Sequence, residues 1–202
     1  MSASDFDAPF PVLAVSAWSG TGKTTLLEQL LPLLGERGLN VGVIKHAHHA
    51  FDVDKPGKDS YRLRSAGAAP MLVASRERFA LMQETPGQNE PDLERLVELM
   101  VPHAPDLVIA EGFKAWPLPK LVLYRDGVGD PAIFRDPWVR AVACKRDERA
   151  ALEQHGPAPD VDRLDLDDVP AVARWIAQWV AGQPAVEPTV EQSNSKGDTT
   201  CI

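Results

Sequence analysis

The sequence is poor in cysteine and has no long apolar run. Cys144 and Cys201 are the only cysteines among its 202 residues, which excludes a disulfide framework and favours a reducing compartment. No stretch of about 18 apolar residues, the length that a membrane-spanning helix requires, occurs in the chain. Residues 1–8 contain two aspartates and lack the apolar centre of a signal peptide. We therefore expect a cytoplasmic protein with no membrane partner.

Positive charge is also scarce. The chain has 21 Lys and Arg against 29 Asp and Glu, a net charge of −8 and a pI near 5.1. A nucleic-acid partner is not expected, because binding phosphates along a strand requires clustered Lys and Arg. The apolar (44%) and charged (25%) fractions are ordinary for a globular protein of this length. We predict a single domain over residues 1–181 and a disordered tail over residues 182–202, where Pro, Glu, Ser and Thr dominate.

Short apolar runs and helical patterns alternate from the N-terminus. Val12–Ser16 and Val41–Lys45 have the composition of buried strands, and residues 24–37 between them carry leucines at helical spacing. This order is typical of the βαβ unit of a parallel sheet. Further strands are predicted at residues 71–74, 78–82, 107–110, 121–124 and 139–144, and helices at residues 59–66, 92–101 and 169–180. The predicted fold class is α/β, a P-loop NTPase-like, mostly parallel sheet flanked by helices, with a β-hairpin extension if residues 71–82 pair.

A glycine-bearing loop joins the first strand to the first helix. Residues 17–25, Ala-Trp-Ser-Gly-Thr-Gly-Lys-Thr-Thr, end in the Gly-Lys-Thr of a Walker A motif. Its backbone N–H groups and the positive end of the helix dipole suit a phosphate, Lys23 adds a positive charge, and the Thr24 hydroxyl suits Mg²⁺. Ala17 departs from the glycine of the strict motif. The predicted nucleotide-binding residues of the loop are Ser19, Gly20, Thr21, Gly22, Lys23, Thr24 and Thr25.

A nucleotide–Mg²⁺ site also needs a carboxylate at the end of a neighbouring strand. Glu111 lies where the apolar run 107–110 meets Gly112, so we expect it at the same sheet edge as the phosphate loop. We predict that Thr24 and Glu111 hold the metal, although a solvated Glu at the strand end is the simpler alternative. Asp106 lies at the opposite end of the run and is a poorer candidate.

A polar loop follows the second strand. Residues 45–55 contain three His and two Asp, for which three interpretations remain open. These are a transition-metal site, a solvated loop, or a loop that senses the γ-phosphate or positions water, with Asp52 and Asp54 as its best carboxylates. Lys55 and Lys58 then precede a helix, and two interpretations are open. The lysines bind a second anionic group, with Lys58 near the nucleotide, or Asp59 and Ser60 cap that helix. Both can hold together.

Base selectivity is indicated by a weaker pattern. Cys144-Lys145-Arg146-Asp147 has the Lys-x-Asp spacing of guanine-specific P-loop proteins, but Cys replaces the usual Asn. On this spacing Asp147 is predicted to bind guanine. Arg78 is a further candidate at the base or the phosphates, with a surface position as its alternative.

Four strings taken together are family-specific: AWSGTGKTTLL, KHAHHAFDVDKPGKDSYRLRSAGA, VASRERFALM and DLVIAEGFKAWPLPK. From Val12 to about Asp126 the chain resembles the MobB family of molybdopterin-guanine dinucleotide biosynthesis adaptors. The resemblance implies a P-loop class related to nitrogenase iron protein and dethiobiotin synthetase, binding of GTP with Mg²⁺, weak hydrolysis and a homodimer. It also implies assistance to MobA, the nucleotidyltransferase that joins GMP to molybdopterin, and leaves open whether molybdopterin itself is bound. By resemblance, residues 20–25 bind phosphates, and Thr24 and Glu111 serve Mg²⁺.

Three functions fit these observations. The first is a GTP-binding adaptor that is at most a slow GTPase, with Lys23, Asp52 and Asp54 as its catalytic candidates; no residue stands out as a strong general base. The second is a small-molecule kinase or ATP-dependent ligase of the dethiobiotin-synthetase-like class, because a phosphate loop serves that chemistry equally well. The third is a scaffold whose nucleotide orders a dimer interface.

Overall fold

The computed structural model describes residues 8–47 and 51–184 of the chain. The described residues divide into two compact units: residues 8–44 with 94–184, and residues 45–47 with 51–93. Most of the predicted tail, residues 185–202, lies outside the described residues. No helix in the described ranges is both long and apolar enough to cross a membrane.

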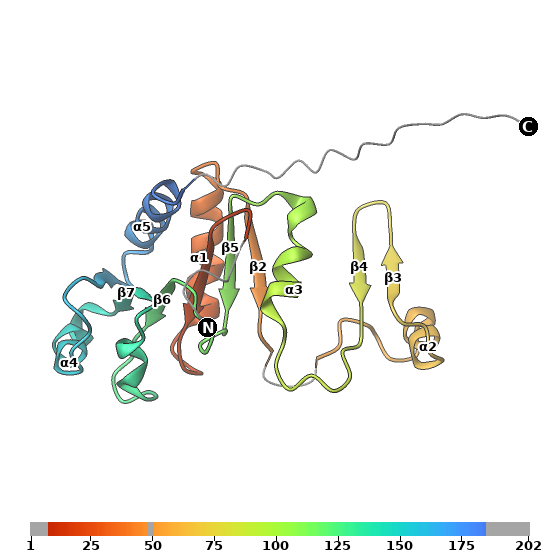
Figure 1. Cartoon of the computed structure of the whole chain (residues 1–202), viewed down its shortest axis with the longest axis horizontal. Coiled ribbons are helices and arrows are strands. Elements are labelled where there is room, and N and C mark those ends of the chain that lie inside the picture. Colours follow the sequence, from red (N-terminus) through yellow and green to blue (C-terminus); the bar gives the residue numbers. More distant parts are fainter. Residues whose placement is uncertain (1–7, 48–50, 185–202) are drawn as a thin grey trace, which may run out of the picture. The chain divides into compact units, whose positions relative to one another are not determined.

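The first unit is built on a six-stranded parallel sheet (Figure 1). Its strand order is β2-β5-β1-β6-β7-β8. The strands are β1 Val12–Ser16, β2 Val41–Lys45, β5 Leu107–Glu111, β6 Lys120–Leu123, β7 Val139–Cys144 and β8 Asp162–Asp165. Every residue of β1 is buried, because β5 and β6 pair with it on either side and its apolar side chains are covered on both faces. The predicted α/β class with a parallel sheet is confirmed.

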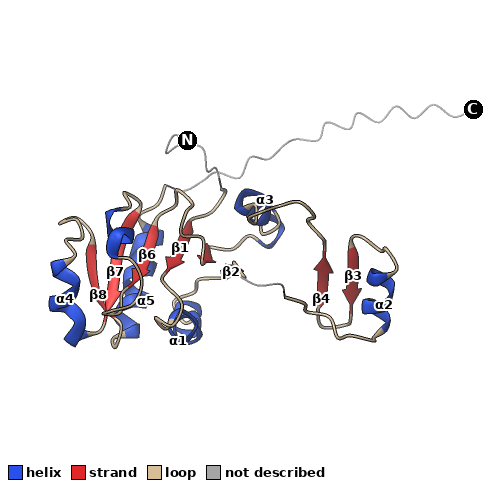
Figure 2. Ribbon diagram, turned by 90° about the horizontal axis from the view of Figure 1, so that it is seen from below, coloured by secondary structure: helices blue, strands red, loops and turns tan. Residues whose placement is uncertain are grey.

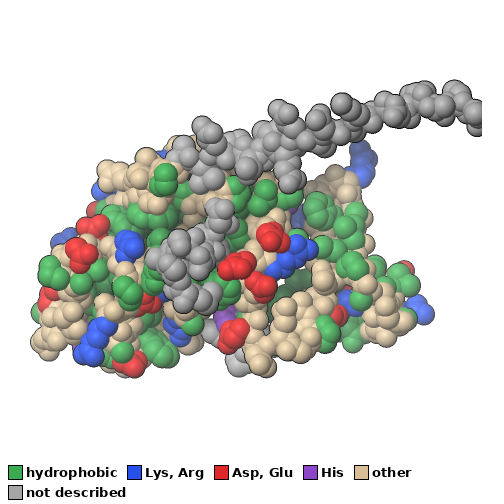
Figure 3. Space-filling view, in the orientation of Figure 1, with side chains coloured by type: hydrophobic (Ala, Val, Ile, Leu, Met, Phe, Trp, Pro, Cys, Tyr) green, Lys and Arg blue, Asp and Glu red, His purple; other side chains and the backbone are tan. Residues whose placement is uncertain are grey.

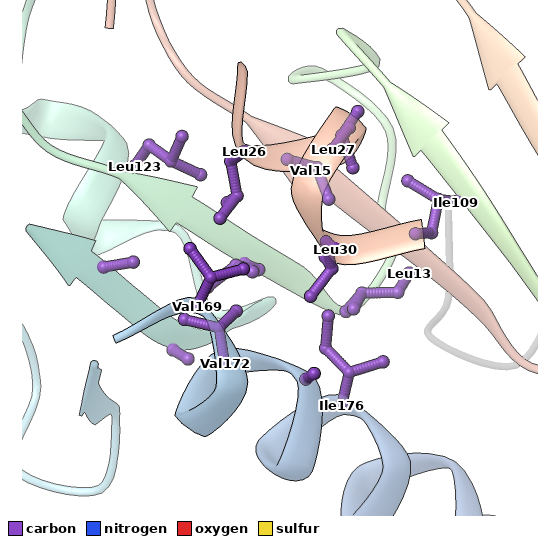
Figure 4. Close-up of a cluster of buried hydrophobic side chains, with 14 of the residues drawn as sticks. Leu13, Val15, Leu26, Leu27, Leu30, Ile109, Leu123, Val169, Val172 and Ile176 are labelled. Carbon is purple, nitrogen blue, oxygen red and sulfur yellow. The ribbon is translucent and has the colours of Figure 1, made fainter. Parts of the chain in front are cut away.

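Two long helices cover one face of this sheet (Figure 2). They are α1, Lys23–Gly35, and α5, Val169–Ala181. Leu30 from α1 and Ile176 from α5 meet Leu13 and Ile109 from the sheet, and all four side chains are fully buried (Figure 4). Burial of each such side chain contributes roughly 1.5–3 kcal/mol. This packing fixes the start of α1 at the carboxyl end of β1.

The opposite face of β6 and β7 is covered by shorter elements. These are the 3-10 helix η2 (Pro131–Arg135) and the α-helix α4 (Arg149–Gln154), which directly follows the 3-10 helix η3 (Arg146–Glu148). Phe134 and Leu152 pack on Val122 and Val142, and the Tyr124 ring meets Phe134 edge-on at 5.6 Å between centroids. The predicted helix over residues 92–101 is instead α3, Leu93–Glu98, followed by the 3-10 turn η1, Val101–His103, which contains Pro102. Proline lacks the N–H that would continue the α-helix.

The second unit consists of α2, Asp59–Ser65, and the hairpin of β3, Met71–Ala74, with β4, Phe79–Met82. The strands pair antiparallel, and Met71 lies opposite Met82, so the hairpin prediction is confirmed. The predicted capping of α2 is wrong: Lys58 is its N-cap residue, no side chain caps the helix, and the Ser60 hydroxyl donates to Asp54. Hydrophobic side chains are exposed on this unit (Figure 3). Leu72 and Phe79 are among the exposed ones.

Candidate functional site

The phosphate loop turns on two glycines between β1 and α1. Gly20 and Gly22 have φ of 82° and 94°, a backbone region that L side chains rarely adopt. Gly22 is the N-cap residue of α1, and no side chain caps the helix there. The Leu26 N–H donates to the Gly22 carbonyl at 2.9 Å, so the N–H groups of the three residues between them precede the first intrahelical bond. These amides, at the positive end of the helix dipole, suit an anion.

Lys23 lies folded against the loop that it follows. Its Nζ donates to the carbonyl oxygens of Ala17 at 3.0 Å and Trp18 at 3.2 Å. The Thr21 hydroxyl also donates to the Trp18 carbonyl, at 2.8 Å, so the loop is curled by its own hydrogen bonds. Ala17 is buried in the core cluster, which explains how the loop accommodates a methyl group in place of the motif's glycine. An ammonium group is thereby held at the mouth of the anion site.

Glu111 lies at the carboxyl end of β5, beside the strand that leads into the loop. It is the register partner of Val15, and only 6% of its surface is exposed. Ile109, two residues earlier, packs in the cluster that α1 covers, and alternation along the strand places Glu111 on that same face. Hydroxyl and carboxylate oxygens are ligands that Mg²⁺ takes together with several waters, and the metal role predicted for Thr24 and Glu111 stays a prediction. Asp106 lies at the opposite edge, where its Oδ2 accepts from the Asn40 N–H at 2.7 Å.

Residues distant from the phosphate loop in sequence contact its Trp18 and Gly20. The Lys114 ammonium lies 4.0 Å from the centre of the Trp18 ring, within cation–π distance. The indole Nε1 donates to the Asp130 carbonyl at 3.4 Å. On the other side of the loop, Arg125 Nη1 donates to the Gly20 carbonyl at 3.2 Å. Lys114 lies in the family-specific string of residues 106–120. No motif contains Arg125 or Asp130, and the strand order brings their segment, which follows β6, to the phosphate loop.

A cavity of about 160 Å³ is lined by Trp18, Tyr124, His155 and the turn of residues 125–131, among others. Burial, followed by the hydrogen bond to Asp126 at 2.9 Å, raises the pKa of Tyr124 to about 12. The phenol is therefore neutral and acts as a hydrogen-bond donor.

A larger cavity, of about 330 Å³, is also lined by Arg125. Thr21, Gly22 and Thr25 line it from the loop and the first turn of α1, and Lys145 and Asp167 line it from the loops after β7 and β8. Asp147, the residue predicted to bind guanine, lies in η3 and is exposed, and it is not among the residues that line this cavity.

The remaining predicted residues lie in the second unit. The Arg64 guanidinium contacts three carboxylates there. It binds Asp52, its Nη1 lies 2.9 Å from Glu84 Oε1, and its Nε lies 3.9 Å from Asp54 Oδ2. The hydrogen bond from the Asp54 N–H, and then Arg64, lower the pKa of Asp52. Lys58 and Arg78 are exposed. Asp52, Asp54, Lys58 and Arg78 are the residues for which nucleotide roles were predicted, and those roles stay predictions.

The transition-metal interpretation of the polar loop has no support in the described residues. They contain no group of three or more His, Cys, Asp or Glu side chains that could hold a metal ion. His48 and His49 of that loop lie outside the described ranges.

Comparison with known proteins gives a consistent answer. The family model for molybdopterin guanine dinucleotide synthesis protein B, MobB, matches residues 12–145. The molybdopterin-guanine dinucleotide biosynthesis adapter protein of Escherichia coli (strain K12) is 46% identical over 174 residues, which cover 82% of this chain and 91% of that protein. Its counterpart in Haemophilus influenzae is 41% identical over 168 residues, covering 82% and 87%. The crystal structure of Bacillus subtilis MobB, 26% identical, superposes with a TM-score of 0.66 over 86% of this chain and all of that one. The chain therefore belongs to the MobB family.

Proposed function

We propose that this protein is an adaptor in molybdopterin guanine dinucleotide synthesis that binds GTP with Mg²⁺ at residues 19–25. The observation that carries the proposal is the loop itself, in which the Lys23 ammonium and the uncapped first turn of α1 meet at the end of a buried strand. Lys23 binds the β- and γ-phosphates, and Thr24 and Glu111 hold the metal. When bound, Mg²⁺ neutralises charge on the phosphates. The names of the relatives, which are adapter proteins, favour this function over a kinase or ligase.

Hydrolysis by such a site is slow. The catalytic candidates of the second unit are Asp52 and Asp54, and Arg64 and the Ser60 hydroxyl already bind their oxygens. A carboxylate whose pKa is lowered, as that of Asp52 is, removes a proton from water less readily, because a weaker base drives proton transfer less. Their proposed role is limited to orienting a water molecule near the γ-phosphate.

The proposed partner is a MobA-like nucleotidyltransferase that attaches GMP to molybdopterin in the cytoplasm. The adaptor keeps GTP available to that enzyme, with or without direct contact to molybdopterin. A homodimer is the proposed state, and the exposed apolar side chains of the second unit are consistent with a protein interface.

Reconstituted cofactor synthesis tests the proposal. Purified MobA-like enzyme, molybdopterin and limiting Mg²⁺–GTP are mixed with the wild-type chain, with Lys23→Ala, or with Arg174→Ala. Arg174 is an exposed cation of α5 and controls for loss of charge in the same unit. We expect wild type and Arg174→Ala to stimulate dinucleotide formation, and we expect no stimulation by Lys23→Ala. Equal stimulation by all three chains contradicts the proposed role of the phosphate loop. Rapid phosphoryl transfer to a small acceptor without the MobA-like enzyme contradicts the adaptor function.

A further inference from the structure

The 330 Å³ cavity beside the phosphate loop has the size and position of a nucleoside site. Four segments line it, each following the carboxyl end of a strand: the loop and α1 after β1, Arg125 after β6, Lys145 after β7, and Leu166, Asp167 and Val169 after β8. Ligands of parallel α/β sheets bind at that edge, and small-molecule sites span about 300–1,000 Å³. The cavity at Trp18 measures about 160 Å³ and falls below that range.

The lining also fixes which end of a nucleotide faces the cavity. Lys23 and Thr24 are the proposed partners of the terminal phosphates and the metal, and neither lines the cavity. Thr21, Gly22 and Thr25 do line it. A nucleotide whose terminal phosphates lie at Lys23 therefore extends its sugar and base past Thr25, toward the loops after β7 and β8.

The last residue of β8 and the loop after it carry three carboxylates, of which two already have structural roles. Asp165 accepts the Asp167 N–H at 3.0 Å through Oδ1 and binds Arg146 at 3.2 Å through Oδ2. Asp168 caps α5 by accepting the Ala171 N–H at 2.9 Å. Asp167 is exposed, lines the cavity, and its side chain has no hydrogen bond or ion pair to any residue in the described ranges.

We propose that Asp167 is the carboxylate that recognises the base of the nucleotide, and that the base is guanine. Its two oxygens accept the N1–H and the N2 amino group of guanine, whereas adenine offers an acceptor at N1 and no amino group at position 2. Leu166 and the methylene chain of Lys145 supply apolar surface for the faces of the ring. This inference rests on the proposed GTP function, and it assigns the base to Asp167 in place of Asp147.

Exchanging a carboxylate for an amide tests the assignment directly. In Asp167→Asn, the side-chain amide group opposes the N2 amino group of guanine but complements the O2 of xanthine. We expect the affinity for Mg²⁺–GTP to fall roughly ten- to hundredfold and that for Mg²⁺–XTP to rise by a similar factor, as for the loss or gain of a two-point base contact. Asp147→Asn is the matched control, because it makes the same change on an exposed residue outside the cavity lining; its affinities should equal those of wild type.

Calorimetric titration of wild type and both variants with GTP, XTP and ATP separates the outcomes, and circular dichroism checks folding. Asp167→Ala is the second variant, and it should lose GTP selectivity without gaining XTP. A GTP-to-XTP preference that is unchanged in Asp167→Asn and Asp167→Ala overturns the assignment and leaves the nucleotide function standing. A specificity switch in Asp147→Asn overturns it in favour of that residue. Wild type that binds no GTP at all overturns the proposed function, and this inference with it.

Discussion

The indole of Trp18 occupies the space where any side chain at Gly129 would lie. A Cβ placed on Gly129 would come within 1.9 Å of Trp18 Cδ1, and Gly129 has a φ of +78°. The turn after β6 can approach the phosphate loop this closely only because residue 129 is glycine. The contact between Trp18 and Gly129 therefore joins two segments that are more than one hundred residues apart in sequence, and it fixes the position of the phosphate loop at Trp18.

Gly129→Ala should disturb the phosphate loop, and Gly127→Ala should not. Gly127 also has positive φ, 69°, but a Cβ there meets no atom within 4 Å, so the two variants share the backbone strain and differ in the clash. We expect Gly129→Ala to lower the free energy of unfolding by about 1–3 kcal/mol more than Gly127→Ala does and to weaken GTP binding. Urea unfolding and nucleotide titration measure both effects. Equal losses in the two variants would show that Trp18 adapts without cost.

The buried pair of Lys120 and Asp136 should matter for stability. Lys120 is 1% exposed, and its Nζ donates to Asp136 Oδ2 at 2.6 Å and to the Trp116 carbonyl at 2.7 Å. Asp136→Asn keeps the size of the side chain and leaves a buried ammonium without its counter-charge, which costs about 3–5 kcal/mol. Denaturant unfolding should show this loss, whereas Glu98→Gln, which breaks the exposed pair with Arg95, should change stability by less than about 1 kcal/mol. Similar losses in both variants would contradict the account of Lys120.

The Tyr124 phenol should ionise at a higher pH than an ordinary tyrosine. Its pKa is raised from 10.0 to about 12, so the neutral phenol stabilises the fold fully below pH 10 and that contribution is lost as the pH rises through about 12. The chain has only two tyrosines, which makes the phenolate absorbance easy to assign. Tyr124→Phe should remove the later transition from the ultraviolet titration and flatten the stability profile in that pH window. Persistence of the late transition in Tyr124→Phe would assign it to Tyr61.

Glu111 should control the metal rather than the phosphates. Glu111→Gln removes the charge at the end of β5 and keeps its size, so GTP binding should require more Mg²⁺ while binding without Mg²⁺ changes little. Titrating Mg²⁺ at fixed GTP measures this, and Asp106→Asn at the opposite edge of the sheet is the control. An unchanged Mg²⁺ requirement in Glu111→Gln would exclude the carboxylate as a metal partner.

Elements whose side chains carry a periodic apolar pattern were predictable from sequence. The strand Val12–Ser16 is buried throughout, and the run of leucines in α1 packs on it as the spacing predicts. Strand β8, Asp162–Asp165, and helix α4 were not predicted. The strand has the sequence DRLD, with one apolar residue, and is held at the sheet edge by backbone pairing to β7. Helix α4 has six residues, too few for a periodicity to show.

The residues of the candidate site likewise fall into those that local sequence predicts and those that depend on the strand order. The loop residues and Glu111 follow strands along the chain, so local sequence was sufficient to predict their place at one sheet edge. Arg125, Gly129 and Asp167 reach the loop only because β6, β7 and β8 follow β1 in the sheet order. No local pattern encodes that order, since it results from packing between segments distant in sequence. Because β8 was not predicted, Asp167 was not considered, and the guanine-binding role predicted for Asp147 stays a prediction beside the proposal for Asp167.

Equilibrium binding of Mg²⁺–GTP by wild type, Lys23→Ala and Arg174→Ala shows whether the loop between β1 and α1 holds the nucleotide. We expect saturable binding to wild type and to Arg174→Ala, preferring GTP over ATP, and no measurable binding to Lys23→Ala, with the circular dichroism of all three unchanged. Full-strength GTP binding by a folded Lys23→Ala would contradict this expectation, because the nucleotide would then lie elsewhere than in the loop between β1 and α1.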